Sequence, residues 1–212
     1  RPPVLMEPAR PAFLPDPDRS REEMQALQRD IAAAATFEDD LTFDPADVGV
    51  TDRVDPAPAD GQTSIGGAAA DGPVVAGVDQ AFLDDRAVSA VVALRGNRVV
   101  ARAHAVEPLS IPYVPGLLSF REGGPIVSAL AALSVEPDLL LFDGSGRIHY
   151  RQAGLATHLG VVFDAPSVGV AKRLLCGTPR GPVDDLSAGE RVAVEADDGV
   201  EAETGTLLGY AL

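Results

Sequence analysis

Three acidic residues stand where predicted structural elements begin or end. Asp79 follows the apolar run VVAGV, Asp143 follows the apolar run LLLF, and Glu122 begins a helix directly after a loop. Ligands of open α/β sheets collect beyond the carboxyl ends of the strands, so carboxylates at strand ends are placed to act on one. Each residue alone could instead be a turn former or a helix N-terminal acid. If the two strands are parallel neighbours, all three side chains meet at one edge of the sheet.

A cluster of three carboxylates implies a bound cation. Like charges a few ångströms apart repel one another strongly in a partly desolvated site, so they stay ionised together only around a positive ion. Oxygen ligands favour a hard cation, Mg²⁺, for which Mn²⁺ can substitute, and its coordination shell is often completed by phosphate oxygens. The pattern therefore predicts metal-assisted phosphodiester hydrolysis.

Two further side chains could serve the same site. Lys172 follows a predicted buried strand, and its ammonium group could bind the scissile phosphate or orient a water. His149 lies on the loop that leads from Asp143 into a predicted helix, where it could contact the substrate. The competing interpretations are a solvated lysine and a structural histidine.

The stretch IPYVPGLLSFREGG, residues 111–124, is unusual for a core segment. Pro112 and Pro115 oppose regular backbone pairing, and the glycines that follow loosen the backbone. We interpret the stretch as a loop that places Tyr113 and Glu122.

The elements that must position these residues alternate between strands and helices. The predicted order is β-β-β-α-β-α-β, with strands over 74–82, 87–95 and 98–108, a helix over 125–134, a strand over 137–144, a helix over 151–163 and a strand over 165–171. The first three strands form an antiparallel meander with a turn at Gly96-Asn97. A further hairpin is expected over 189–212, around Asp197-Asp198-Gly199.

The chain divides into four predicted parts. Residues 1–19 are rich in Pro, Arg and Asp and are expected to be disordered. Residues 20–37 form a helix, with Ser20 as N-cap and Glu23 as its capping-box partner. Residues 38–72 form an acidic insertion or linker rich in Gly, Pro and Ala. Residues 73–212 form the regular domain.

The composition restricts the cell compartment and the partners. The net charge is −15, from 17 basic and 32 acidic residues. Such acidity argues against nucleic acid as a partner, unless it is an adaptation to a cytoplasm of high salt, which we favour. The sequence has no apolar run of the roughly 18 residues that span a membrane and no signal peptide, so we expect a cytoplasmic monomer with no membrane contact. The single Cys176 excludes an internal disulfide and a cysteine-based zinc site.

Five motifs in order, within residues 72–178, resemble the endonuclease V family, the deoxyinosine 3′ endonucleases. They are VVAGVD, IPYVPGLLSFREGG, DLLLFDGSG, RIHYRQAGLATHLGV and SVGVAKRLLCG. The helix MQALQRDIAAAATFEDD also looks like the family's N-terminal helix. The resemblance implies an α/β, RNase H-like fold with a mixed central sheet flanked by helices. It implies a DNA repair enzyme that recognises deoxyinosine, which is deaminated adenine, and hydrolyses the second phosphodiester bond 3′ to it.

The resemblance also implies roles for particular residues. Mg²⁺ would be held by Asp79, Glu122 and Asp143. The groups near the scissile phosphate would be Lys172 and His149. Tyr113 would be a wedge that separates the strands at the lesion, stiffened by Pro112 and Pro115. The main chain of Leu118, Gly144 and Gly146 would form the pocket for the hypoxanthine base. A mispaired base is easier to extrude from a duplex than a paired one, which favours damaged sites.

Two departures and three alternatives accompany this resemblance. Ser145 stands where the family usually has histidine, and the family continues past Leu212 with a further strand and helix, so we expect domain 73–212 to be incomplete at its C-terminus. One alternative is an endoribonuclease specific for inosine in RNA, and another is a truncated domain that binds inosine-containing nucleic acid with little catalysis. The third is a sugar-kinase or actin-like ATPase, but Gln80-Ala81-Phe82 stands where these need a phosphate-binding loop.

Overall fold

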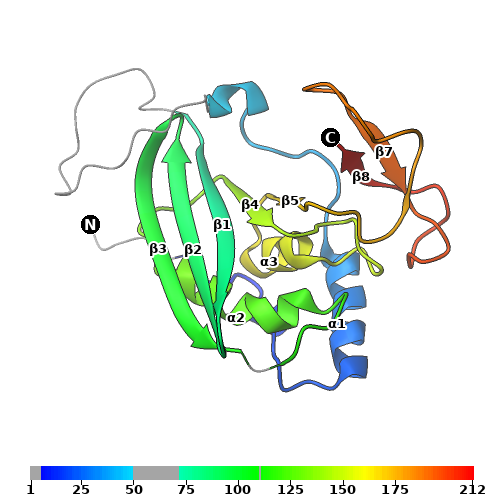
Figure 1. Ribbon diagram of the computed structural model, residues 1–212. Coiled ribbons are helices and arrows are strands. Elements are labelled where there is room, and N and C mark those ends of the chain that lie inside the picture. The colour runs from blue at the N-terminus through cyan, green and yellow to red at the C-terminus, as the bar shows by residue number, and fades with distance from the viewer. Residues whose placement is uncertain (1–5, 50–71, 110) are drawn as a thin grey trace.

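A five-stranded mixed sheet forms the centre of the part that the computed structural model describes, residues 6–49, 72–109 and 111–212. Its strands are β1 (Val74–Leu83), β2 (Arg86–Arg95), β3 (Arg98–Pro108), β4 (Leu139–Asp143) and β5 (Ser167–Val170), in the order β3-β2-β1-β4-β5. The first three are antiparallel, while β4 and β5 run parallel to β1. Figure 1 shows the long β1–β3 meander on one side of the molecule. The predicted element order along the chain, β-β-β-α-β-α-β, and the turn at Gly96-Asn97 are confirmed.

Two helices bury one face of this sheet. These are α2 (Leu118–Ala131) and α3 (Leu155–Phe163). Alternate residues of β1 and β4 point into the same apolar core as both helices, as expected for strands with one buried face. The fully buried members with the largest side chains include Ile126, Leu130, Leu140, Phe142 and Leu159. The arrangement is the α/β, RNase H-like fold that the resemblance implied.

The N-terminal helix α1 (Arg21–Ala34) begins as the sequence predicts. The backbone N–H of Glu23 donates to Ser20 Oγ, and the Ser20 N–H donates at 2.8 Å to the Glu23 carboxylate, which completes the capping box. The apolar stripe of Met24, Leu27 and Ile31 is buried. This stripe holds α1 against the helical layer, where it contacts α3.

Residues 6–19 differ from the predicted disordered tail. Met6 is buried in the main core, the Arg10 N–H donates to the Val162 carbonyl at 2.9 Å, and Pro11–Phe13 forms a 3-10 turn. His158 Nε2 contacts the Phe13 carbonyl oxygen at 2.7 Å. The few apolar residues of this proline-rich segment are therefore enough to anchor it. Residues 1–5 of the predicted tail lie outside the described residues.

The predicted 38–72 insertion is described only at its two ends. Residues Pro45–Val48 form a 3-10 turn, whose start is capped by Asp44 accepting from the Ala46 N–H. Positions 50–71 lie outside the described residues, so this prediction stays a prediction.

The predicted C-terminal hairpin is present but belongs to a separate small sheet. This sheet comprises β6 (Thr178–Pro179), β7 (Val192–Glu195) and β8 (Leu207–Ala211), in that order. A small apolar cluster of Ala196, Val200 and Leu208 supports it. It lies apart from the five-stranded sheet in Figure 1. None of the helices in the described ranges is long and apolar enough to cross a membrane.

Candidate active site

Asp79 and Asp143 lie on neighbouring parallel strands. The last paired residues of β1 and β4 are Val78 and Phe142, so the two aspartates are the next residue on each strand. Both side chains are exposed. The prediction that Asp79 stands at the end of an element is wrong, because β1 continues to Leu83, one residue beyond the predicted strand 74–82, by pairing with β2. Asp79 is nonetheless placed where β1 loses its partner on the β4 side.

The prediction that Glu122 begins a helix is also wrong. Helix α2 starts at Leu118, and it contains Gly123, Gly124 and Pro125 in its interior. Glycine and proline destabilise the interior of a helix, which is why the sequence pattern indicated a loop here. Tertiary packing explains the first glycine, because a Cβ on Gly123 would lie 2.5 Å from Pro15 Cγ. The glycine thus lets the N-terminal segment pack directly on α2.

The Glu122 carboxyl group is buried beside two polar partners. Its side chain accepts a hydrogen bond of 3.1 Å from Gln80 Nε2, and Arg121 Nη1 lies 3.7 Å from its other oxygen. Burial raises the pKa of Glu122 to about 7, against the lowering effect of Arg121, and the negative charge of Asp143 raises it further. Burial and the neighbouring Asp143 therefore disfavour the ionised form of this carboxyl group.

Lys172 lies beside Asp143, at the edge of the sheet where it was expected, and its contact with a phosphate stays a prediction. Its Nζ atom lies 3.9 Å from Asp143 Oδ2, and its side chain is 90% exposed. A pair this open to solvent contributes little stability, so the lysine remains free to meet another anion.

The donor set suits a hard divalent cation, although the side chains do not yet converge on one point. In the ranges that the structure describes, no three His, Cys, Asp or Glu side chains form a group that could hold a metal ion. Asp79, Glu122 and Asp143 offer oxygen ligands alone, which Mg²⁺ prefers, and the repulsion between Glu122 and Asp143 is the feature that a cation would relieve. The residues therefore fit the ion in chemistry, provided that Glu122 turns from its present partners.

A cavity of about 150 Å³ lies between the loop before α2, the turn after β4 and the segment after β5. Four of the predicted site residues line it: Tyr113, Leu118, Gly144 and His149. Ser145 and Arg173 also line it, and the lining residues that sequence reasoning missed are Gly116, Ser119, Ala153, Gly154, Leu155, Ala171 and Leu175. Pro112, Pro115, Gly146 and Lys172 are not part of its lining. Tyr113 is 63% exposed, so its ring is open to solvent as well as to the cavity.

Glycines keep the turn after β4 close to its neighbours. A Cβ on Gly169 would lie 2.4 Å from the Gly144 carbonyl oxygen, and one on Gly154 would lie 2.4 Å from the Ser145 carbonyl oxygen. The Gly144 N–H also donates to the Val170 carbonyl at 2.9 Å. The glycine in RQAGLA and the glycine in SVGVAK are the residues from which the sequence could have indicated this close approach.

His149 is buried and held by backbone groups at both ring nitrogens. The Arg151 N–H donates to Nδ1 at 3.2 Å, so Nε2 carries the proton and donates to the Gly116 carbonyl at 3.1 Å. Burial lowers the pKa of His149 to about 4, with nearby Arg151 adding to the effect. The neutral ring thus joins the turn after β4 to the loop before α2, and contact with a phosphate stays a prediction.

Acidification should destabilise the protein through His149. Its folded pKa of about 4 lies below the ordinary 6.5, so the unfolded chain binds more protons within this window and the free energy of unfolding falls as pH decreases. Between pH 7 and pH 5 we expect His149→Gln, which keeps an N–H donor but does not titrate, to lose up to about 2 kcal/mol less than the unsubstituted chain. Urea denaturation at both pH values, without added metal, measures this. Equal losses in the two proteins would contradict the assignment.

The chain is similar to proteins of one known family. The family model described as Endonuclease V matches residues 63–210. A protein described as Endonuclease V from Natronomonas pharaonis is 60% identical over 97% of this chain and 75% of its own length. One of the same description from Halobacterium salinarum is 55% identical over 98% of this chain and 78% of its own length.

Solved structures show the same fold. The Endonuclease V of Streptomyces avermitilis superposes with a TM-score of 0.61 at 30% identity, covering 96% of this chain and 80% of that one. The Ciona intestinalis Endonuclease V, in complex with a 24mer DNA containing an inosine followed by a ribo-adenosine, gives a TM-score of 0.60 at 23% identity. That comparison covers 89% of this chain and 74% of the other.

Proposed function

The chain belongs to the endonuclease V family and is thus a nuclease, and we propose that it nicks DNA on the 3′ side of deoxyinosine, at the second phosphodiester bond, with Mg²⁺. The observation that carries this proposal is the placement of two carboxylates, Asp79 and Asp143, directly after the last pair of β1 and β4, at the same end of the sheet as a small cavity. The cavity would take the base, and the carboxylates would act on the backbone.

The cavity supports recognition of one extruded base. At about 150 Å³ it is smaller than the pockets that hold drug-sized ligands, and it matches a single ring system better. Leu118 and Gly144 carry no polar side-chain group, so at these two positions backbone hydrogen bonds would select the base. Tyr113 is free to stack in the gap that the base leaves. The Ciona intestinalis protein with an inosine-containing DNA is consistent with such a substrate.

The carboxylates and Lys172 would divide the chemistry at the phosphate. Mg²⁺ bound by Asp79, Glu122 and Asp143 would supply a Lewis acid and an activated water. The Lys172 ammonium, now 3.9 Å from Asp143, would pair with a nonbridging phosphate oxygen. Burial raises the pKa of Glu122 to about 7, and both the bound cation and Arg121, whose charge lowers that pKa, would favour the ionised carboxylate.

Nicking of a labelled duplex tests the proposal directly. The substrate carries one deoxyinosine, and the assay compares Mg²⁺ with EDTA, at low and at molar KCl, because a chain with a net charge of −15 should retain activity when screening is strong. We expect a Mg²⁺-dependent nick on the 3′ side and none in the undamaged duplex.

Parallel substrates separate the alternatives. A single inosine in RNA tests the endoribonuclease, and a binding assay with the same oligonucleotides tests a domain that binds without cutting. Faster cleavage of the RNA would overturn the DNA assignment, while tight binding to inosine without a nick would favour the binding domain.

A further inference from the structure

We propose that Gln28 of α1 is a positioning residue for the loop of residues 111–117, and through it for recognition of the damaged base. The inference rests on the proposed function for its substrate, but the contact itself is independent of it. Gln28 is 88 positions before Gly116 in the chain, yet its side chain touches the Gly116 carbonyl.

Gln28 uses both ends of its amide group. Its Nε2 donates to the Gly116 carbonyl at 2.8 Å, and its Oε1 accepts from Arg151 Nη1 at 3.1 Å. The side chain is buried, with 1% of its surface exposed. Because each end has a partner of the opposite kind, the orientation of the amide is defined and a buried polar group is satisfied.

The Gly116 carbonyl is the point at which this loop is fixed. It accepts from His149 Nε2 as well as from Gln28, so two donors hold one oxygen. The residue has φ of +79°, and a Cβ there would lie 2.9 Å from Tyr150 Cδ2. The peptide is thus held from three sides in a conformation that only glycine adopts readily.

The position of Gly116 determines where Tyr113 is presented. The two residues are three apart, and Gly116 lies inside a turn that starts directly after Tyr113, which the Leu117 N–H closes by donating to the Val114 carbonyl at 3.0 Å. At the other end of the loop, Arg121 Nε donates to the Ile111 carbonyl at 3.2 Å. Tyr113 itself is exposed, so these anchors rather than its own packing set its place.

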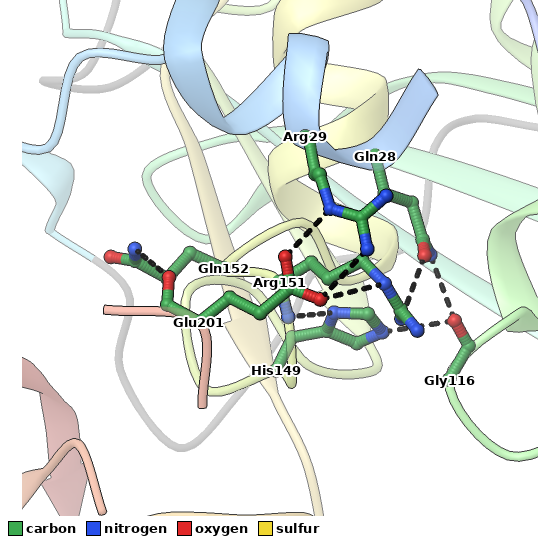
Figure 2. A network of polar contacts seen from close by, with 7 residues as sticks. All are labelled: Gln28, Arg29, Gly116, His149, Arg151, Gln152 and Glu201. Carbon is green, nitrogen blue, oxygen red and sulfur yellow. Dashed lines mark hydrogen bonds and ion pairs between the residues drawn. The ribbon is translucent and has the colours of Figure 1, made fainter. Parts of the chain in front are cut away.

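Gln28 also joins this anchor to the C-terminal part of the chain. Figure 2 shows Arg151 between Gln28 and Glu201, with Arg151 Nε 3.5 Å from Glu201 Oε1. Arg29 donates to both oxygens of the same carboxylate, from Nε to Oε2 at 2.7 Å and from Nη2 to Oε1 at 3.0 Å. The guanidinium group that donates to Gln28 thus also lies within ion-pair distance of Glu201, so the amide of Gln28 is the link between this charged cluster and the Gly116 carbonyl.

Two substitutions of Gln28 test the role, with a matched control in the same helix. Gln28→Met keeps the length and removes both hydrogen bonds. Gln28→Glu, ionised beside the Arg151 guanidinium, keeps the acceptor for Arg151 but removes the donor to Gly116, so it disturbs the loop while preserving the contact between α1 and Arg151. Gln25→Met makes the same chemical change at a half-buried position of α1.

The first readout is the dissociation constant for a duplex with one deoxyinosine and for the same undamaged duplex, without added metal. We expect both Gln28 variants to bind the damaged duplex about five- to tenfold more weakly, with undamaged binding and the Gln25→Met protein unchanged. The nicking rate at saturating DNA and Mg²⁺ should change less than threefold, because the carboxylates are untouched. The second readout, amide hydrogen exchange, should become faster in 111–117 and stay constant in α1.

The outcomes separate this inference from the proposed function. Normal affinity for the damaged duplex in both variants overturns the inference, and so does a loss confined to the rate at saturation. If the unsubstituted chain itself does not distinguish deoxyinosine, the proposed function fails, and hydrogen exchange then decides the role of Gln28. Unchanged exchange in 111–117 would overturn it.

Discussion

Replacing Asp143 with asparagine is expected to lower the rate of nicking at least about a thousandfold while affinity for the deoxyinosine duplex stays within about threefold. The side chain ends β4, is exposed, and has the Lys172 ammonium as its charged neighbour, so the substitution removes a charge and leaves packing intact. Asparagine has nearly the same shape, but it cannot neutralise a divalent cation. The measurement is single-turnover cleavage with excess protein in Mg²⁺, alongside binding without metal.

Asp85→Asn is the matched control for this experiment. Asp85 is another exposed aspartate, in the turn between β1 and β2, and its replacement removes one unit of negative charge from the same domain. We expect unchanged cleavage in that variant. Full activity of Asp143→Asn would remove Asp143 from the metal site, and equal losses in both variants would indicate a general effect of charge.

Replacing Tyr113 with alanine should weaken binding to the deoxyinosine duplex about 10- to 100-fold. Stacking of one base on an aromatic side chain is worth about 1–3 kcal/mol, and about 1.4 kcal/mol corresponds to a tenfold change in the dissociation constant. The ring is 63% exposed, so it stabilises the fold little and its loss should leave the thermal midpoint nearly unchanged. Fluorescence anisotropy with damaged and undamaged duplexes measures the effect.

Two further variants define the meaning of this loss. Tyr113→Phe keeps the stacking surface and should bind nearly as well as tyrosine. Tyr210→Ala removes an exposed aromatic ring from β8, in the separate small sheet, and should have no effect. A weakened Tyr113→Phe protein would shift the role from stacking to the hydroxyl group, and normal affinity of Tyr113→Ala would remove the wedge assignment.

Local patterns predicted most of the elements. The capping box at Ser20 and Glu23, the turn at Gly96-Asn97 and the apolar strand before Asp143 are each specified by residues within a few positions of one another. These predictions were confirmed because the structure that the local residues favour is also the one that buries their apolar side chains. The predicted start of α2 was wrong because local propensity and burial disagree in this segment. Two glycines and a proline, which disfavour helix, stand inside a helix that the rest of the fold buries.

The sequence by itself determined the order of the elements, the carboxylates that follow the apolar runs of two strands, and the family, since motifs and periodicity are local properties. Only the tertiary structure decided that Glu122 is buried with a raised pKa, that His149 donates to the loop before α2, and that Gln28 supports the same carbonyl. These features depend on which distant groups meet and how much water they lose. A hydrogen bond between residues 28 and 116 has no periodicity that a linear pattern could reveal, because it forms only after the helix and the loop have packed around a shared core.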